Sequence, residues 1–143
     1  MRNAGGNFVC FGDKYYCYYC ADPKERSAIY CRVSEDLRLW GPSKIVNSGG
    51  SLGSGRCMAQ CPFVIWLEES QRYYLFRSSN DERTGVYASK DPMDFGVGDD
   101  SCLVCVLRHK APEIIVHQDK YYIAALRKKR DGIDMARLTW GKP

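Results

Sequence analysis

The chain of 143 residues is long enough for one domain with a buried core, and its 45% apolar content is ordinary for a globular protein. No stretch approaches the roughly 20 apolar residues of a membrane-spanning helix, and the N-terminal residues lack the apolar run of a secretory signal. These features exclude a membrane-spanning helix and predict a cytoplasmic protein. The net charge of +4 is too small to indicate nucleic-acid binding.

The first third of the chain predicts four β-strands. Aromatic and β-branched residues favour strands, and here they gather in runs that polar turns separate. The predicted strands are residues 7–11, 15–20, 28–33 and 44–47. Trp40, in the turn before the fourth strand, is expected to pack back on the sheet. The glycine- and serine-rich residues 48–55 follow, and we expect a connection that needs conformational freedom more than packing.

The rest of the chain repeats this plan. A second group of strands is predicted at residues 61–67, 73–77, 84–88 and 102–107. A third group is predicted at residues 112–117, 121–126 and 133–138, and the sequence ends before a fourth strand of that group. The first two strands of each group read as a β-hairpin, because two apolar runs flank a short polar turn.

Paired tyrosines mark these hairpins as an internal repeat. The pairs begin at Tyr15, Tyr73 and Tyr121, each at the start of the second hairpin strand. Several short strands per unit, with no helical segment between units, are typical of β-propeller blades. We therefore predict an all-β protein, a partial β-propeller of about three four-stranded antiparallel blades with the last incomplete. It would form a single domain, residues 1–143, with repeats at about 1–50, 56–108 and 109–143.

Two features invite other functions. The basic run Arg127-Lys128-Lys129-Arg130 lies between two predicted strands, and a solvated turn explains it without nucleic acid. The sequence has eight cysteines, and two pairs, beginning at Cys17 and Cys102, have the Cys-x-x-Cys spacing of some zinc sites.

Geometry argues against a metal at these cysteines. Both pairs lie in runs of strand character, where residues three apart point to opposite faces of the sheet. We expect buried, reduced thiols and no metal or cofactor. Cys57 and Cys61 flank the start of the central hairpin and are the cysteines expected nearest a site. His109 and His117 have no partner motif, so neither indicates a metal site or a nucleophile.

The repeated pattern resembles the five-bladed β-propeller glycoside hydrolases, those of family 43 and the family 32-like enzymes. The residues that carry the resemblance are Pro62-Phe63-Val64, Tyr73-Tyr74-Leu75-Phe76, Val86 to Pro92, Ala111 to Ile115 and Tyr121 to Leu126. The match covers nearly the whole chain and corresponds to a propeller that lacks its first blade. The resemblance implies a protein that acts on carbohydrate by hydrolysing glycosidic bonds, a reaction that needs two carboxyl groups.

The carboxyl groups that the resemblance implies are missing or replaced. The first-blade aspartate has no counterpart, the second-blade aspartate falls on Gly5, and the third-blade glutamate, two residues before a proline, falls on Gln60. A side-chain amide accepts and donates hydrogen bonds, so Gln60 could bind a sugar, but it cannot act as a general acid.

Three other residues are candidates for a sugar site. Glu113, directly after Pro112, is either a surviving acid or sugar ligand, or a structural carboxylate. Arg77 could reach the cavity as a polar clamp, although a surface role is the alternative for it and for Arg56. Trp66 could stack on a sugar ring, or belong to the core. We therefore predict Glu113 as the only candidate catalytic residue, and Gln60, Arg77 and Trp66 as candidate substrate-binding residues.

Two functions remain open from the sequence. The chain is either a glycoside-hydrolase-like protein that is catalytically impaired, or a non-catalytic module for sugar binding or protein assembly. An arc of about three blades leaves two sheet faces uncovered, so we also expect a homodimer or another oligomer that completes the propeller.

Overall fold

The structure, a computed structural model, describes residues 6–20, 27–127 and 131–141. Its described residues form three β-sheets. The first sheet contains β1 (Gly6–Phe11), β2 (Lys14–Cys20), β3 (Ala28–Ser34), β4 (Lys44–Gly49) and β8 (Val97–Gly98). The second contains β5 (Gln60–Leu67), β6 (Arg72–Ser78), β7 (Thr84–Ser89) and β9 (Leu103–Leu107). The third contains β10 (Lys110–His117), β11 (Lys120–Leu126) and β12 (Ile133–Leu138).

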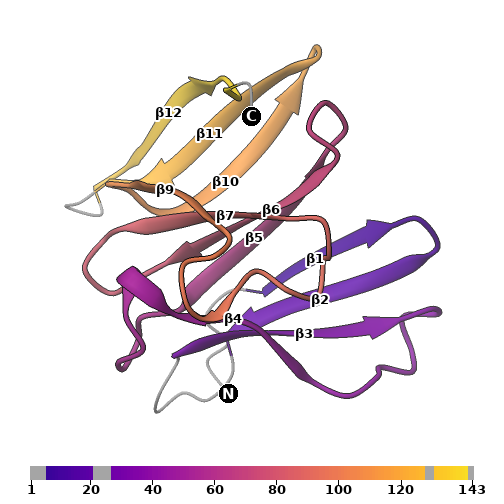
Figure 1. The fold of residues 1–143 in the computed structure, drawn as a ribbon. Coiled ribbons are helices and arrows are strands. Elements are labelled where there is room, and N and C mark those ends of the chain that lie inside the picture. Colours follow the sequence, from indigo (N-terminus) through magenta and orange to yellow (C-terminus); the bar gives the residue numbers. More distant parts are fainter. Residues whose placement is uncertain (1–5, 21–26, 128–130, 142–143) are drawn as a thin grey trace.

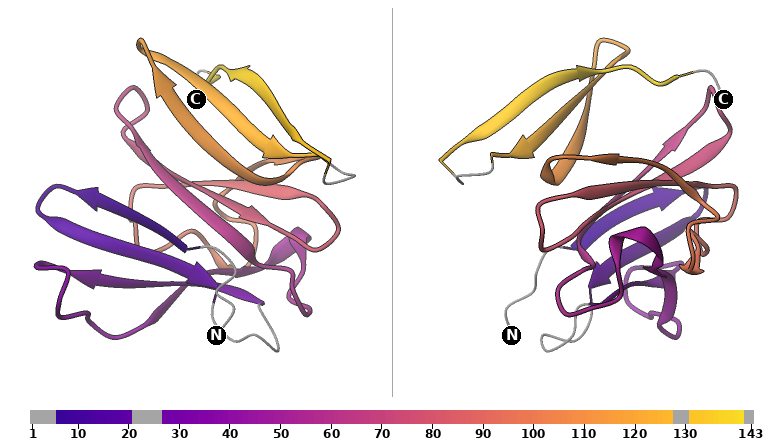
Figure 2. Two further views of the ribbon diagram at one scale, coloured as in Figure 1. Left: turned by 180° about the vertical axis from the view of Figure 1, so that it is seen from behind. Right: turned by 60° about the vertical axis from the view of Figure 1, so that its left-hand side comes forward.

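The three sheets lie one above another, with the second sheet in the middle (Figures 1 and 2). Their hairpin turns, at the ends of β1, β5 and β10, all point to the same side of the molecule (Figure 1). Within each sheet the strands follow chain order and pair antiparallel, apart from β8. This is the architecture of a partial β-propeller, so the predicted all-β fold is confirmed. No helix in the described part of the chain is long and apolar enough to cross a membrane.

β8 is the element that the sequence did not predict. Residues 97 and 98 belong to the second repeat, yet they pair parallel with Ser48 and Gly49 of the first sheet. These two segments of the backbone approach each other closely, since a Cβ on Gly49 would lie 2.9 Å from the Cα of Gly98. A side chain at Gly49, whose φ is +65°, would therefore be obstructed as well as strained. The second repeat thus extends over the edge of the first.

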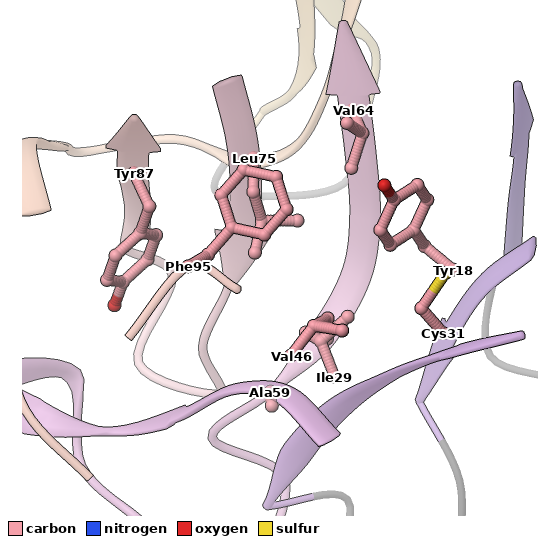
Figure 3. Packing of buried hydrophobic residues seen from close by; sticks show 9 residues of the cluster. All are labelled: Tyr18, Ile29, Cys31, Val46, Ala59, Val64, Leu75, Tyr87 and Phe95. Carbon is pink, nitrogen blue, oxygen red and sulfur yellow. The ribbon is translucent and has the colours of Figure 1, made fainter. Parts of the chain in front are cut away.

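The first core lies between the first and second sheets. Tyr18, Ile29 and Val46 of the first sheet meet Val64 and Leu75 of the second, all fully or almost fully buried (Figure 3). The Tyr18 hydroxyl donates a 2.7 Å hydrogen bond to the Pro92 carbonyl, so the polar end of this buried ring has a partner. Burial is the main reason why the pKa of the Tyr18 hydroxyl is raised.

A second core joins the second and third sheets. Phe76, Val86 and Ile114 are its most buried residues, and the ring of Trp140 packs against Tyr74 with ring centres 4.8 Å apart. Because β6 sends Leu75 to one core and Phe76 to the other, the second sheet is covered on both faces, as expected from the alternation of side chains along a strand.

Several local expectations can be compared with the structure. Trp40 packs on Phe8 of the first sheet with ring centres 6.0 Å apart, as predicted. The connection at residues 48–55 uses the expected conformational freedom, since Gly49, Gly50 and Gly53 have positive φ values. It is also packed, which was not expected, because it contains a 3-10 turn, Gly50–Leu52, and Leu52 is fully buried. In the basic run, Arg127 pairs with Asp134 at 2.8 Å, whereas Lys128 to Arg130 lie outside the described residues.

The cysteines differ in part from expectation. Cys31 is buried, and burial raises the pKa of its thiol to about 12. Cys10 and Cys105 are exposed, so the prediction that the thiols are buried is wrong for these two. Among the described residues no group of three or more histidine, cysteine or acidic side chains could hold a metal ion.

Candidate functional site

The first strands of the second and third sheets begin with the same irregularity. The strand pairing of β5 shifts between Gln60 and Phe63, and that of β10 shifts between Lys110 and Glu113. In both strands the residue before the proline has a positive φ, +46° at Cys61 and +48° at Ala111. Such a conformation is uncommon outside glycine. The two strands are thus kinked alike, which makes Lys110 the structural counterpart of Gln60 and Glu113 the counterpart of Phe63.

Gln60 lies at the start of β5, against the connection that leads into the strand. It is 9% exposed, and its Nε2 donates a 2.6 Å hydrogen bond to the carbonyl oxygen of Cys57. Cys57, with a φ of +63°, therefore lies beside the candidate residue Gln60. The amide is fixed by this bond and offers its oxygen for other contacts, but it has no proton to transfer at ordinary pH.

Glu113 lies at a different position. Its neighbour Ile114 is buried in the core between the second and third sheets, so Glu113 points to the opposite face of the third sheet. The side chain is exposed, and no hydrogen bond joins it to another described residue. The structure does not bring Glu113 and Gln60 to equivalent positions, because the counterpart of Glu113 in the second sheet is Phe63.

Arg77 is fully buried, so the surface role that the sequence suggested for it is wrong. Its Nε donates to the Met58 carbonyl at 3.0 Å, and its Nη1 donates to Asn47 Oδ1 at 3.0 Å and to the Gly49 carbonyl at 3.1 Å. Its Nη2 donates to the carbonyl of Gly53. Burial lowers the pKa of this guanidinium. Arg77 thus holds the connection before β5 in place, and through it the Cys57 carbonyl that binds Gln60.

Trp66 is near the other end of β5, six residues after Gln60, or about 20 Å along an extended strand. It lines a cavity of about 610 Å³ together with Phe11 and Tyr73. Its Nε1 donates a 2.8 Å hydrogen bond to Glu68 Oε2, and its ring packs on Tyr73 with ring centres 4.6 Å apart. Trp66 and Gln60 therefore cannot contact the same sugar unit.

The structure also reveals a polar cavity that sequence reasoning missed. It lies where β6 turns into β7, beside the start of β10, and its volume is about 440 Å³. Charged residues from two separate turns line it, among them Glu82, Arg108 and Lys110. The only signal in the sequence is a high density of charge in both turns, and this does not show that the turns meet.

The fold and these sites define a partial β-propeller with polar groups at the start of its first strands. Comparison with family models and with curated proteins finds no match to the sequence. Solved structures do match. A family 43 β-1,3-galactosidase, in complex with galactodeoxynojirimycin, superposes with a TM-score of 0.76 at 13% identity, over 97% of this chain and 58% of the other.

Two further structures extend the comparison. An endo-1,4-β-xylanase from Bacteroides thetaiotaomicron matches with a TM-score of 0.68 at 22% identity, over 96% of this chain and 47% of the other. An α-L-arabinofuranosidase from Clostridium thermocellum matches with a TM-score of 0.66 at 15% identity, over 95% of this chain and 51% of the other. The fold is that of the five-bladed propeller glycoside hydrolases, as the sequence pattern indicated, and the chain spans about half the length of these structures.

Proposed function

We propose that this chain is a carbohydrate-related β-propeller protein of the glycoside hydrolase type that by itself has little or no glycosidase activity. The fold supports the first part of the proposal. The second part rests on one observation, the amide of Gln60 at the start of β5, where the resemblance implies the acid. Glycoside hydrolysis needs one carboxyl group to protonate the leaving oxygen and another to activate water or attack the sugar.

The other candidate carboxylate does not replace this acid. Glu113 points away from the second sheet and is exposed to solvent, whereas a general acid for this reaction has to share one substrate position with a second carboxylate. Gly5, the counterpart of the second-blade aspartate, lies outside the described residues and has no side-chain carboxylate in any conformation. The chain therefore offers no pair of carboxyl groups at the expected positions.

An assay with aryl xylosides, arabinofuranosides, galactosides and fructoside analogues tests this proposal. We expect turnover no greater than the uncatalysed background for every substrate. Gln60→Glu alone should not create activity, because a second carboxylate is missing as well. Turnover well above background that disappears in Glu113→Gln would contradict the proposal and assign the reaction to Glu113.

The second candidate function is a non-catalytic module for sugar binding or protein assembly. The aromatic cavity formed by Phe11, Trp66 and Tyr73 favours sugar binding, since a sugar ring stacks well on aromatic side chains. The uncovered faces of the first and third sheets favour assembly. Retention on immobilised polysaccharides without turnover of aryl glycosides would favour the binding module over an impaired enzyme.

A further inference from the structure

The polar cavity at the start of β10 is formed by two turns that come from different parts of the chain. Asp81, Glu82 and Arg83 lie in the turn between β6 and β7. Arg108 and His109 lie in the connection from β9, and Lys110 is the first residue of β10. We call this cavity the turn pocket. Its volume of about 440 Å³ falls in the range of roughly 300 to 1,000 Å³ that is common for small-molecule sites.

The first wall of the turn pocket is fixed by its own hydrogen bonds. The amide of Ser79 donates to the Arg83 carbonyl at 2.8 Å, and the Ser79 hydroxyl donates to the same carbonyl at 3.1 Å and to the carboxylate of Asp81. Arg83 Nε pairs with Asp81 Oδ2 at 2.6 Å. Glu82 has a φ of +64°, a conformation that persists only where the surroundings hold it. The turn therefore presents Glu82 in a defined position.

Two buried hydroxyl groups tie the second wall to the first. Thr84 Oγ1 donates a 2.7 Å hydrogen bond to the carbonyl of His109, and Ser78 Oγ accepts one from the amide of Ala111 at 2.8 Å. Ser78 and Thr84 contact each other at 3.0 Å, and neither is exposed to solvent. The segment from Arg108 to Lys110 is thus held beside the turn that contains Glu82 before any ligand binds, which lowers the entropy cost of binding.

The pocket contains charged groups without protein partners. Glu82 Oε2 is enclosed, and it has no hydrogen-bond donor among the described residues. Arg108 and Lys110 form no ion pair with any residue in the described part of the chain. An enclosed carboxylate oxygen without a donor is costly, and this oxygen is closed to solvent in the present side-chain conformation. The Glu82 side chain is part-exposed, so turning it toward the pocket would let a ligand hydroxyl donate to the carboxylate and remove that cost.

We propose that the turn pocket binds an acidic sugar, a hexuronic acid or an oligosaccharide that contains one. Arg108 and Lys110 receive its carboxylate, and Glu82 accepts a hydrogen bond from a ring hydroxyl. A simple inorganic anion would leave the Glu82 oxygen without a donor, and a neutral sugar would leave both cations unpaired. This proposal rests on the carbohydrate-related function proposed above, and it assigns the sugar class to a site separate from Gln60.

Titration by isothermal calorimetry and by amide chemical shifts tests the proposal. The ligands are glucuronate, galacturonate, glucose, galactose, sodium phosphate and sodium acetate at constant ionic strength. We expect a uronate to bind at least roughly tenfold more tightly than its neutral sugar or than phosphate and acetate. Lys110→Met and Arg108→Gln should each weaken uronate binding by a similar factor, and Glu82→Gln should weaken it while leaving the weak acetate binding unchanged.

Lys90→Met is the matched control, because Lys90 is an exposed lysine in another turn, and it should leave binding unchanged. Thermal melts of each variant establish that it is folded. Equal affinity for uronate and phosphate would show an unspecific anion site and overturn the proposal, as would uronate binding that is insensitive to Lys110→Met. Absence of uronate binding would overturn it too, without affecting the proposed lack of glycosidase activity, which a separate assay measures.

Discussion

Arg77 shows how one residue can connect two sheets. A fully buried cation is costly unless hydrogen bonds replace its hydration. Here Arg77 donates to two carbonyl oxygens in the connection before β5, and to Asn47 and the Gly49 carbonyl of β4 in the first sheet. The arginine therefore contributes to stability mainly because its absence leaves several polar groups unsatisfied.

We predict that Arg77→Met lowers the free energy of unfolding by about 3 kcal/mol or more, because methionine fills the space but donates no hydrogen bond. Urea denaturation followed by circular dichroism measures the change. The matched control is Arg38→Met at an exposed arginine in a turn, expected to change stability by less than about 0.5 kcal/mol. Equal stability of the two variants would show that the buried hydrogen bonds of Arg77 are dispensable.

At the scale of elements, the segment that contains β8 joins the first two sheets. The Phe95 amide donates a 2.7 Å hydrogen bond to the Val46 carbonyl, and Asn47 Nδ2 donates to the carbonyls of Phe95 and Gly96 at 2.8 and 3.1 Å. The ring of Phe95 is fully buried beside Tyr18 and Leu75 (Figure 3). The segment thus adds an apolar anchor and several hydrogen bonds to the contact between the sheets.

We expect Phe95→Ala to destabilise the protein by about 3 to 5 kcal/mol, the usual cost of removing a large buried ring. Val97→Ala, two residues later on β8 and 52% exposed, serves as the control and should cost less than about 1 kcal/mol. Thermal and urea unfolding compare the two variants. A cost for Phe95→Ala as small as that of Val97→Ala would mean that the segment contributes little to holding the sheets together.

For the whole molecule, the uncovered sheet faces are the main feature. On the first sheet, Tyr19, Tyr30 and Ile45 are neighbours across three strands and face away from the second sheet, and Phe8 beside them is 66% exposed. On the third sheet, Ile133 and Met135 are each 65% exposed. Two apolar faces at opposite ends of the stack are unfavourable in a monomer. Two copies related by a two-fold axis would cover both faces at once.

We therefore predict a homodimer, in which the third sheet of one copy packs on the first sheet of the other. Size-exclusion chromatography with light scattering should give about twice the chain mass of 16.3 kDa. Met135→Lys, in the uncovered face, should produce the monomer, whereas Leu39→Lys, at a 79% exposed turn residue, should not. A well-dispersed 16.3 kDa species with a cooperative melt would contradict the prediction.

The sequence by itself determined every strand except β8, since strand formation depends on local alternation and turn residues, and the repeated tyrosine pairs mark the hairpins. These patterns predicted the three sheets and the propeller resemblance, and the Gln60-Cys61-Pro62 motif located one candidate residue. The sequence could not determine which face of the sheet a side chain occupies once the strand pairing has shifted at an irregularity. A shift of one residue in a strand moves every later side chain to the other face, so the kink at Ala111 decided the direction of Glu113.

Only the tertiary structure decided the contacts between distant segments. β8 pairs with a strand about fifty residues earlier, Arg77 is buried by the connection before its own hairpin, and the turn pocket forms where two charged turns meet. Local sequence gives no sign of these contacts, because charged and glycine-rich residues usually lie at the surface. These contacts depend on long-range packing that no local pattern contains.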